Sequence, residues 1–329
     1  MSDGGRRARG HRLISAAAFI LIIAPAVVWA EDPDEARLEV KVGGRVFARA
    51  KADERTEWER EMSLRSARLE LEARFGIARA VMEAELAGGN LIKDAYVRVE
   101  PMEWLRFYAG QFRAPFMARA LESRWALPLM SRGLVERYLT EDHQLAGRRL
   151  GIMGELKVDA WREFEVQLGA FQGAEDELGH RLGEDLSARV AFEPWNQRLD
   201  IGVNAYWASP GAEARFAAGV DAAFDVGGLR VDAEALVGRL AMGRFTAQLL
   251  LVSWRVPVGE GNTWAVEPHV AGEALQLVGA STGTAASALA GVNVHYGERI
   301  RVQTQVERAL RPGDRAAGTE LAVQLGVRF

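Results

Sequence analysis

The chain has 329 residues, a formal net charge of −4 and no cysteine. The absence of cysteine excludes a disulfide framework and any metal site with thiolate ligands. The acidic balance argues against nucleic acid as a partner, because that binding depends on neutralising phosphates with lysine and arginine. The 34 glycines suit a chain in which many strands are joined by turns.

The first 30 residues have the three parts of a secretory signal peptide. The basic stretch MSDGGRRARGHR precedes the apolar run LISAAAFILIIAPAVVW, and the small-residue ending VWA precedes Glu31. This pattern predicts that residues 1–30 are cleaved and that residues 31–329 form the mature protein. The alternative is an uncleaved inner-membrane anchor, because the apolar run is close to the shortest length that spans a bilayer. Cleavage would lower the net charge from −4 to −7, since it removes four arginines and one aspartate.

After Glu31 the dominant pattern is an alternation of apolar and polar residues with a period of two. In RLEVKVGGRVFAR, residues 37–49, the apolar side chains share one face and the charged ones the other, with Phe47 as the exception. About sixteen such segments occur, each of about ten residues, which is the length that a tilted strand needs to cross a bilayer. Their centres are Val42, Leu69, Met82, Tyr96, Phe107, Ile152, Val166, Val190, Val203, Val220, Ala233, Leu249, Val270, Val292, Val302 and Val323.

The connections between these segments alternate between short and long. The short ones are at 75–76, 101–103, 194–197, 227–228 and 297–298, and the long ones at 49–63, 113–147, 172–186, 276–286 and 308–318. Short turns at one end and long loops at the other predict an all-β protein, a transmembrane antiparallel β-barrel of the outer membrane over residues 31–329. Tryptophans flank the short turns, as an aromatic belt at a membrane interface would require. They are Trp104, Trp161, Trp195 and Trp264.

A soluble β-sandwich would also alternate, and it is the main structural alternative. The apolar faces here are rich in alanine, valine and leucine and nearly free of charge, as a lipid-facing surface must be. A charge near the middle of that face costs roughly 2–4 kcal/mol. Lys93 is an exception, placed near a loop where its long side chain can reach the interface. Pro268 predicts a bulge within its strand, and QLLLVSW, residues 248–254, has no clean alternation.

The long connection 113–147 is the third on the extracellular side and is rich in arginine. A barrel of about sixteen strands leaves a water-filled lumen, so we expect this loop to fold inward and constrict the pore. The candidate residues of the constriction are Arg113, Arg119, Arg124, Arg132 and Arg137. The candidate pore-lining residues on the strands are Arg68, Arg98, Arg106, Arg149 and Arg189.

A ring of arginines favours anions, and the guanidinium fork suits the oxygens of phosphate. The alternative is that nearby acids neutralise the arginines of the loop, which would then narrow the pore without selecting anions. The acids close to them in sequence are Glu122, Glu136, Glu141 and Asp142.

Several motifs, in order along the chain, resemble the phosphate-selective porin O and P family of bacterial outer membranes. They include KDAYVRVEP (93–101), LRFYAGQFRAPF (105–116), SRWALPLMSRGL (123–134), RRLGIMGEL (148–156) and AGVNVHYGERIRVQTQVE (290–307). The resemblance implies a homotrimeric porin of sixteen strands in which the third loop holds small anions such as phosphate. Ser123 and Arg132 match the serine and arginine of that loop, and Arg113 matches a basic position in the family.

This chain departs from the family in its charges. Its only lysines are Lys41, Lys51, Lys93 and Lys157, so a lysine-rich vestibule is excluded. The positions expected to face the lumen also include acids, namely Glu70, Glu72, Glu83, Glu85, Glu163, Glu165 and Glu234. Mixed charges select less strongly than arginine alone. We therefore expect passive diffusion of small hydrophilic solutes with an anion preference, in a barrel surrounded by outer-membrane lipid.

Two other functions are compatible with a barrel. One is an outer-membrane protease or phospholipase, for which Asp142–His143 is the only adjacent acid–histidine pair, and no Gly-x-Ser-x-Gly motif occurs. The other is a non-conducting barrel whose loop fills the lumen. We expect no catalytic residue, no metal site and no cofactor, because none of their sequence motifs is present.

Overall fold

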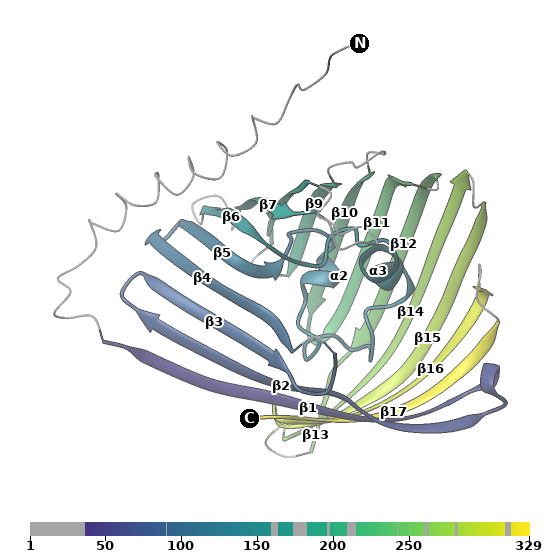
Figure 1. Cartoon of the computed structure of the whole chain (residues 1–329). Coiled ribbons are helices and arrows are strands. Elements are labelled where there is room, and N and C mark those ends of the chain that lie inside the picture. The colour runs from purple at the N-terminus through teal and green to yellow at the C-terminus, as the bar shows by residue number, and fades with distance from the viewer. Residues whose placement is uncertain are drawn as a thin grey trace, which may run out of the picture.

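The chain folds into one closed antiparallel sheet (Figure 1). The computed structural model describes residues 37–89, 91–158, 164–173, 183–195, 198–208, 215–241, 243–259, 261, 263–279, 282–312 and 317–329. The strands are β1 (Glu39–Asp53), β2 (Glu59–Phe75), β3 (Ala78–Glu85), β4 (Ile92–Met102), β5 (Leu105–Arg113), β6 (Arg148–Val158), β7 (Phe164–Gln172), β8 (Glu184–Phe192), β9 (Leu199–Ala208), β10 (Arg215–Val226), β11 (Leu229–Leu240), β12 (Gly243–Trp254), β13 (Val256–Val258), β14 (Trp264–Gly279), β15 (Gly283–Tyr296), β16 (Ile300–Pro312) and β17 (Gly318–Arg328). The predicted signal peptide, residues 1–30, lies outside the described residues.

Each strand pairs with its neighbour in sequence, and β1 pairs with β17 from Arg45↔Arg328 to Asp53↔Glu320, which closes the ring. The short strand β13 continues β12, because both pair with β14 in one register, from Gly243↔Gly279 to Val258↔Trp264. With β12 and β13 counted as one strand, the barrel has sixteen strands. This confirms the predicted fold and the predicted number of strands. Closure leaves no open edge, as a sheet in hydrocarbon requires.

The long connection between β5 and β6, residues 114–147, carries short helices. They are α2 (Ala118–Leu121), α3 (Leu134–Arg137) and the π-helical turn η3 (Tyr138–Asp142), while the turn between β1 and β2 holds η2 (Glu54–Thr56). Figure 1 shows α2 and α3 inside the ring of strands. Among the described residues, no helix has the length and apolar character needed to cross a membrane.

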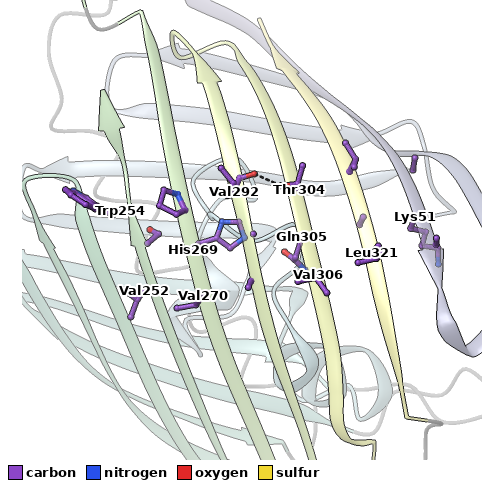
Figure 2. A pocket seen from close by; sticks show the side chains of 18 of the residues that line it. Lys51, Val252, Trp254, His269, Val270, Val292, Thr304, Gln305, Val306 and Leu321 are labelled. Carbon is purple, nitrogen blue, oxygen red and sulfur yellow. Dashed lines mark hydrogen bonds between the residues drawn. The ribbon is translucent and has the colours of Figure 1, made fainter. Parts of the chain in front are cut away.

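The outer face of the barrel is apolar. On β9 the outward residues Ile201, Val203 and Trp207 are 44–56% exposed, while Tyr206 between them is buried. Figure 2 shows a groove on this outer face that runs across β12 and β14 to β17 toward β1, lined mainly by aliphatic side chains such as Val270. Aliphatic side chains pack favourably against the acyl chains of lipid, whereas their exposure to water is unfavourable.

The predicted aromatic belt is present at three of its four positions. Trp104, Trp195 and Trp264 are about half exposed beside the short turns, and Trp161 lies outside the described residues. The alternation of the last strand is also confirmed, because Leu321, Val323 and Leu325 point outward and Gln324 is buried on the inner side. These features place the short turns at one membrane interface.

Two local irregularities have structural causes that the sequence did not reveal. Phe47 interrupts the alternation because it faces inward and packs on Trp125 of the 114–147 connection, with ring centroids 5.6 Å apart. The segment 248–254 lacks a clean pattern because its inward residues, including Leu249 and Leu251, are also apolar and buried beneath the same connection.

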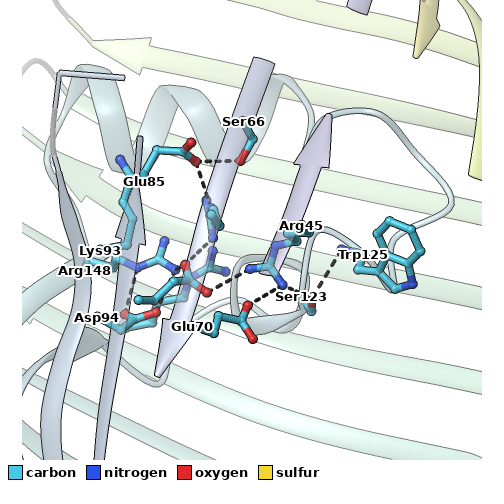
Figure 3. Close-up of polar contacts among 12 residues, drawn as sticks. Arg45, Ser66, Glu70, Glu85, Lys93, Asp94, Ser123, Trp125 and Arg148 are labelled. Atoms are coloured by element: carbon cyan, nitrogen blue, oxygen red, sulfur yellow. Dashed lines mark hydrogen bonds and ion pairs between the residues drawn. The ribbon is translucent and has the colours of Figure 1, made fainter. Parts of the chain in front are cut away.

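Two expectations about individual residues were wrong. Pro268 causes no bulge, since the register of β12 and β13 against β14 is the same on both sides of it. The ladder is interrupted at Trp254 and Arg255, opposite Pro268 and Glu267. Lys93 does not extend along the lipid face. A register shift between β3 and β4 occurs beside it, and Figure 3 shows its side chain next to Glu85 on the inner side. Bulges commonly re-aim a side chain in this way.

Candidate functional site

The interior loop, residues 114–147, packs against one side of the barrel interior. Its apolar side chains Leu127, Leu129 and Leu139 are fully buried. Leu129 clusters with Leu251 on the inner face of β12, and Leu139 belongs to the cluster that includes Leu275 of β14. We name the inner faces of β11, β12, β14, β15 and β16 the far wall. Burial of this many aliphatic side chains holds the loop inside the barrel by the hydrophobic effect.

Two carboxylates of the far wall anchor the loop where its helices begin. Glu234 accepts a hydrogen bond of 3.0 Å from the backbone N–H of Ala118. Glu273 accepts one of 3.0 Å from Arg119 Nη1 and one of 3.1 Å from the backbone N–H of Val135. The side chains of Arg119 and Glu273 are 4% and 0% exposed. This buried pair therefore lies beneath the loop, away from solvent.

The anchorage continues along β11, β15 and β16. Glu122 of the loop and Arg230 of β11 form a bidentate ion pair with two contacts of 2.7 Å. Arg301 of β16 donates to the carbonyl oxygens of Trp125 and Leu127, both at 2.9 Å. The loop carbonyls are thus satisfied by side chains of the far wall, as buried backbone groups must be.

The opposite side of the interior, formed by β1 to β6, carries charged residues, and we name it the near wall. Arg68 pairs with Glu83 and Glu85, Arg98 with Glu100, and Arg106 with Glu155. These three predicted pore-lining arginines are therefore compensated by carboxylates of the strands.

The two remaining predicted lining arginines differ. Arg189, on β8, forms a bidentate pair with Asp221 at 2.5 and 2.7 Å and is 7% exposed. Arg149 donates instead to the carbonyl oxygen of Gln144, at the extracellular end of β6. A paired arginine contributes little net field to the lumen, so Arg189 acts mainly within the wall.

Arg113, at the end of β5, and Arg132, of the interior loop, are compensated differently. Arg113 donates to the carbonyl oxygen of Glu122 at 3.3 Å, and Arg132 donates to the carbonyl oxygens of Arg119 and Glu122. Carbonyl groups satisfy the N–H donors without cancelling the charge. Among the described residues, neither arginine makes an ion pair with a carboxylate, and the same is true of Arg124 and Arg137.

The pKa values of two loop arginines reflect this uncompensated charge. Burial and the neighbouring Arg65, Arg132 and Arg68 lower the pKa of Arg124 to about 9. Burial, opposed in part by Glu136, lowers the pKa of Arg132 to about 10. Both groups remain charged at neutral pH. A shift in this direction means that the charged form lacks stabilisation, which a bound anion would supply.

Ser123 lies between the loop and the near wall. Its hydroxyl is 3.2 Å from the backbone N–H of Trp125 and 3.5 Å from Arg45 Nη1, from both of which it accepts (Figure 3). Unlike Arg132, which is 7% exposed, Ser123 is exposed. Arg113, Arg124 and Arg132 each lie close enough to Arg68 or Arg148 of the near wall to interact with it electrostatically, so with Ser123 they face the near wall. Arg119 lies on the far side, against Glu273.

Several arginines near Ser123 were not among the predicted site residues. Arg45 and Arg49 point inward from β1, and Arg148 at the start of β6 pairs with Asp94 at 2.8 Å. The alternation in residues 37–49 placed Arg45 and Arg49 on the polar face, so the signal for them was present. Arg148 could not be found in this way, because it lies where the strand meets the loop.

The predicted neutralisation of the loop arginines by nearby acids does not occur through Glu122. Its carboxylate is committed to Arg230 of the far wall. Within the described part of the chain, no group of three or more histidines and acids could hold a metal ion. The candidate site is therefore a set of charged side chains arranged around the interior loop.

A closed sixteen-stranded barrel with an apolar outside, a charged inside and a loop packed within it defines an outer-membrane porin. A family model described as "Phosphate-selective porin O and P" matches residues 40–240, more than half of the chain. The chain belongs to the phosphate-selective porin O and P family. Membership confirms the predicted family, the outer-membrane location and the expectation that the protein is a porin and not an enzyme.

Solved structures support the fold. The anion-selective porin from Comamonas acidovorans is 14% identical, with a TM-score of 0.61 over 89% of this chain and 99% of that one. OmpF of Salmonella typhi, in complex with daunomycin, is 10% identical, with a TM-score of 0.65 over 91% and 100%. OmpT of Vibrio cholerae in its trimer form is 10% identical, with a TM-score of 0.62 over 89% and 99%. A comparison with curated proteins found no match.

Proposed function

We propose that this porin is an anion-preferring diffusion pore whose passage runs between the interior loop and the near wall. Small oxyanions such as phosphate would meet Ser123 and Arg124 first, with Arg113 and Arg132 adding positive potential from within the loop. The observation that carries the proposal is that the arginines differ in whether a carboxylate compensates their charge. Arg68, Arg106 and Arg189 of the wall are paired with carboxylates, whereas Arg113 and Arg132 donate to carbonyl oxygens of the loop.

Arg119 and Arg137 have different places in this proposal. Arg119 was expected in the constriction, but its pairing with Glu273 beneath the loop suits an anchoring role. Arg137 closes α3 and contributes at most to the general field. A loose anion preference, short of strict phosphate specificity, is what the mixture of paired and uncompensated arginines supports. Binding in a pore must be weak enough to let the solute leave.

We also propose that residues 1–30 are removed on export and that three mature chains assemble. The signal pattern of the N-terminus supports the first part, and N-terminal sequencing of the membrane form should begin at Glu31. The trimer form of the structurally similar Vibrio cholerae OmpT supports the second part. A homotrimer would carry three separate pores, each with its own interior loop.

Single-channel recording of the wild-type protein in a planar bilayer tests the proposed function. In a potassium chloride gradient, the reversal potential should have the sign of anion selectivity, and added phosphate should reduce the chloride current. Each inserted complex should close in three equal steps. A reversal potential of the cation-selective sign would overturn the anion proposal, and single-step closures would overturn the trimer. A protein that inserts without conducting would favour the non-conducting barrel.

A further inference from the structure

Three arginines of the near wall converge on one carboxylate. Glu83 of β3 contacts Arg45 Nη2 through Oε2 at 2.8 Å and Arg148 Nη2 through Oε1 at 3.2 Å. Arg68 also donates to Oε1. The three arginines come from β1, β2 and β6, and the side chain of Glu83 is 10% exposed. Three guanidinium groups directed at two oxygen atoms form the kind of site that binds a phosphate oxyanion.

Each of these arginines also has a carboxylate of its own. Glu70 lies 2.8 Å from Arg45 Nη1. Glu85 accepts from Arg68 Nε at 2.9 Å. Asp94 accepts from Arg148 at 2.8 and 2.9 Å, as Figure 3 shows. Glu83 is therefore a fourth carboxylate, shared by all three arginines, and pairwise neutralisation of the cluster does not require it.

The cluster adjoins the proposed passage. Arg45 Nη1 lies 3.5 Å from the hydroxyl of the exposed Ser123, and the side chain of Glu70 is 40% exposed. The register of β3 against β4 shifts between Glu83 and Ala84, and a bulge of this kind aims a side chain that a regular strand would not. The carboxylate of Glu83 thus occupies a point that an oxyanion passing Ser123 could otherwise reach.

We propose that Glu83 is a built-in competitor for an oxyanion site formed by Arg45, Arg68 and Arg148. Its carboxylate fills the site and so keeps phosphate-like solutes from dwelling there, which favours passage over capture. A tethered carboxylate is present at a high effective concentration and is displaced only by a solute that binds better. This inference rests on the proposed anion pathway. It assigns to Glu83 the control of how tightly that pathway binds an oxyanion.

The test is the block of chloride current by phosphate in Glu83→Gln. Glutamine keeps the size and one acceptor oxygen but removes the charge. The variant should be blocked at a phosphate concentration about tenfold lower than wild type, the change expected from one additional charge-assisted hydrogen bond. Glu72→Gln is the matched control, because Glu72 of the adjacent strand β2 pairs with Arg79 and, among the described residues, with no arginine of the cluster. It should leave the blocking concentration unchanged.

The outcomes separate this inference from the proposed function. A wild-type pore that is cation-selective would remove the proposed function itself. An anion-selective wild type with equal blocking concentrations in Glu83→Gln, Glu72→Gln and wild type would overturn only the role of Glu83. If Glu83→Gln does not insert as a stable barrel, Glu83→Ala and Glu83→Asp take its place. Alanine should strengthen the block and aspartate should not, and the reverse order would contradict the inference.

Discussion

Glu273→Gln is expected to release the interior loop from the far wall and to raise the single-channel conductance several-fold. Glu273 is fully buried and accepts hydrogen bonds from both Arg119 and the backbone of Val135. Removing its charge leaves the guanidinium of Arg119 buried without a counter-ion, which costs about 3–5 kcal/mol. This free energy should weaken the packing of the loop against the far wall and leave the barrel intact, since the strands keep their backbone hydrogen bonds. The open channel should also become noisier and less anion-selective.

A second change removes the same contact without removing a charge. Gly133 has φ +98°, and a Cβ there would lie 1.7 Å from Oε1 of Glu273. Gly133→Ala should therefore also raise the conductance. The double variant Arg119→Met with Glu273→Gln removes both charges and should recover part of the wild-type conductance, because no buried charge is then left without a counter-ion. Wild-type conductance and noise in Glu273→Gln would contradict this anchorage.

Replacing Arg124 and Arg132 together by alanine is expected to shift the reversal potential toward cations. Neither arginine has a carboxylate partner among the described residues, so the loss of each removes a full uncompensated charge from the loop. The interaction energy between one such charge and an ion about 4 Å away is about 1 kcal/mol in water. The loss of two, about 2 kcal/mol together, should lower the anion-to-cation permeability ratio by roughly thirtyfold.

Lysine substitutions separate charge from geometry at the same positions. Arg124→Lys with Arg132→Lys keeps both charges but loses the planar forks that match two phosphate oxygens. This variant should keep the reversal potential in chloride and lose part of the phosphate block. The double variant Arg79→Ala with Glu72→Gln is the control, since it removes a paired arginine and its carboxylate together. A shift in the control as large as in the alanine variant would refute the special role of the loop arginines.

The fold was predictable from sequence because lipid imposes a strict rule on every strand. Each predicted centre, from Val42 to Val323, lies within a strand of the barrel. The alternation of apolar and polar residues was lost where the residues facing the barrel interior were also apolar. Leu249 and Leu251 face inward, but the interior loop covers them and gives them an apolar environment. Alternation alone cannot show such a covered region, and Phe47 was an exception for the same reason.

The composition of the site was predictable, but its pairing was not. The concentration of arginines in residues 113–147 was evident, as was the polar face that carries Arg45 and Arg49. Which arginine meets which carboxylate depends on the path of the loop through the lumen. Glu122 was close in sequence to four loop arginines, yet it binds Arg230, which is 108 residues away. Contacts of this range arise from tertiary packing and leave no local sequence pattern.

The proposed passage requires that the loop face carrying Ser123 borders the water-filled lumen. The chain contains no cysteine, so a single thiol introduced by Ser123→Cys can be modified alone while current is recorded. A negatively charged methanethiosulfonate reagent should react within the open pore and sharply reduce the chloride current, and a positively charged one should reduce it much less. Val203→Cys, on the lipid-facing side of β9, should give no change with either reagent. Unaltered current in Ser123→Cys after confirmed labelling, or equal effects of the two reagents, would contradict the account.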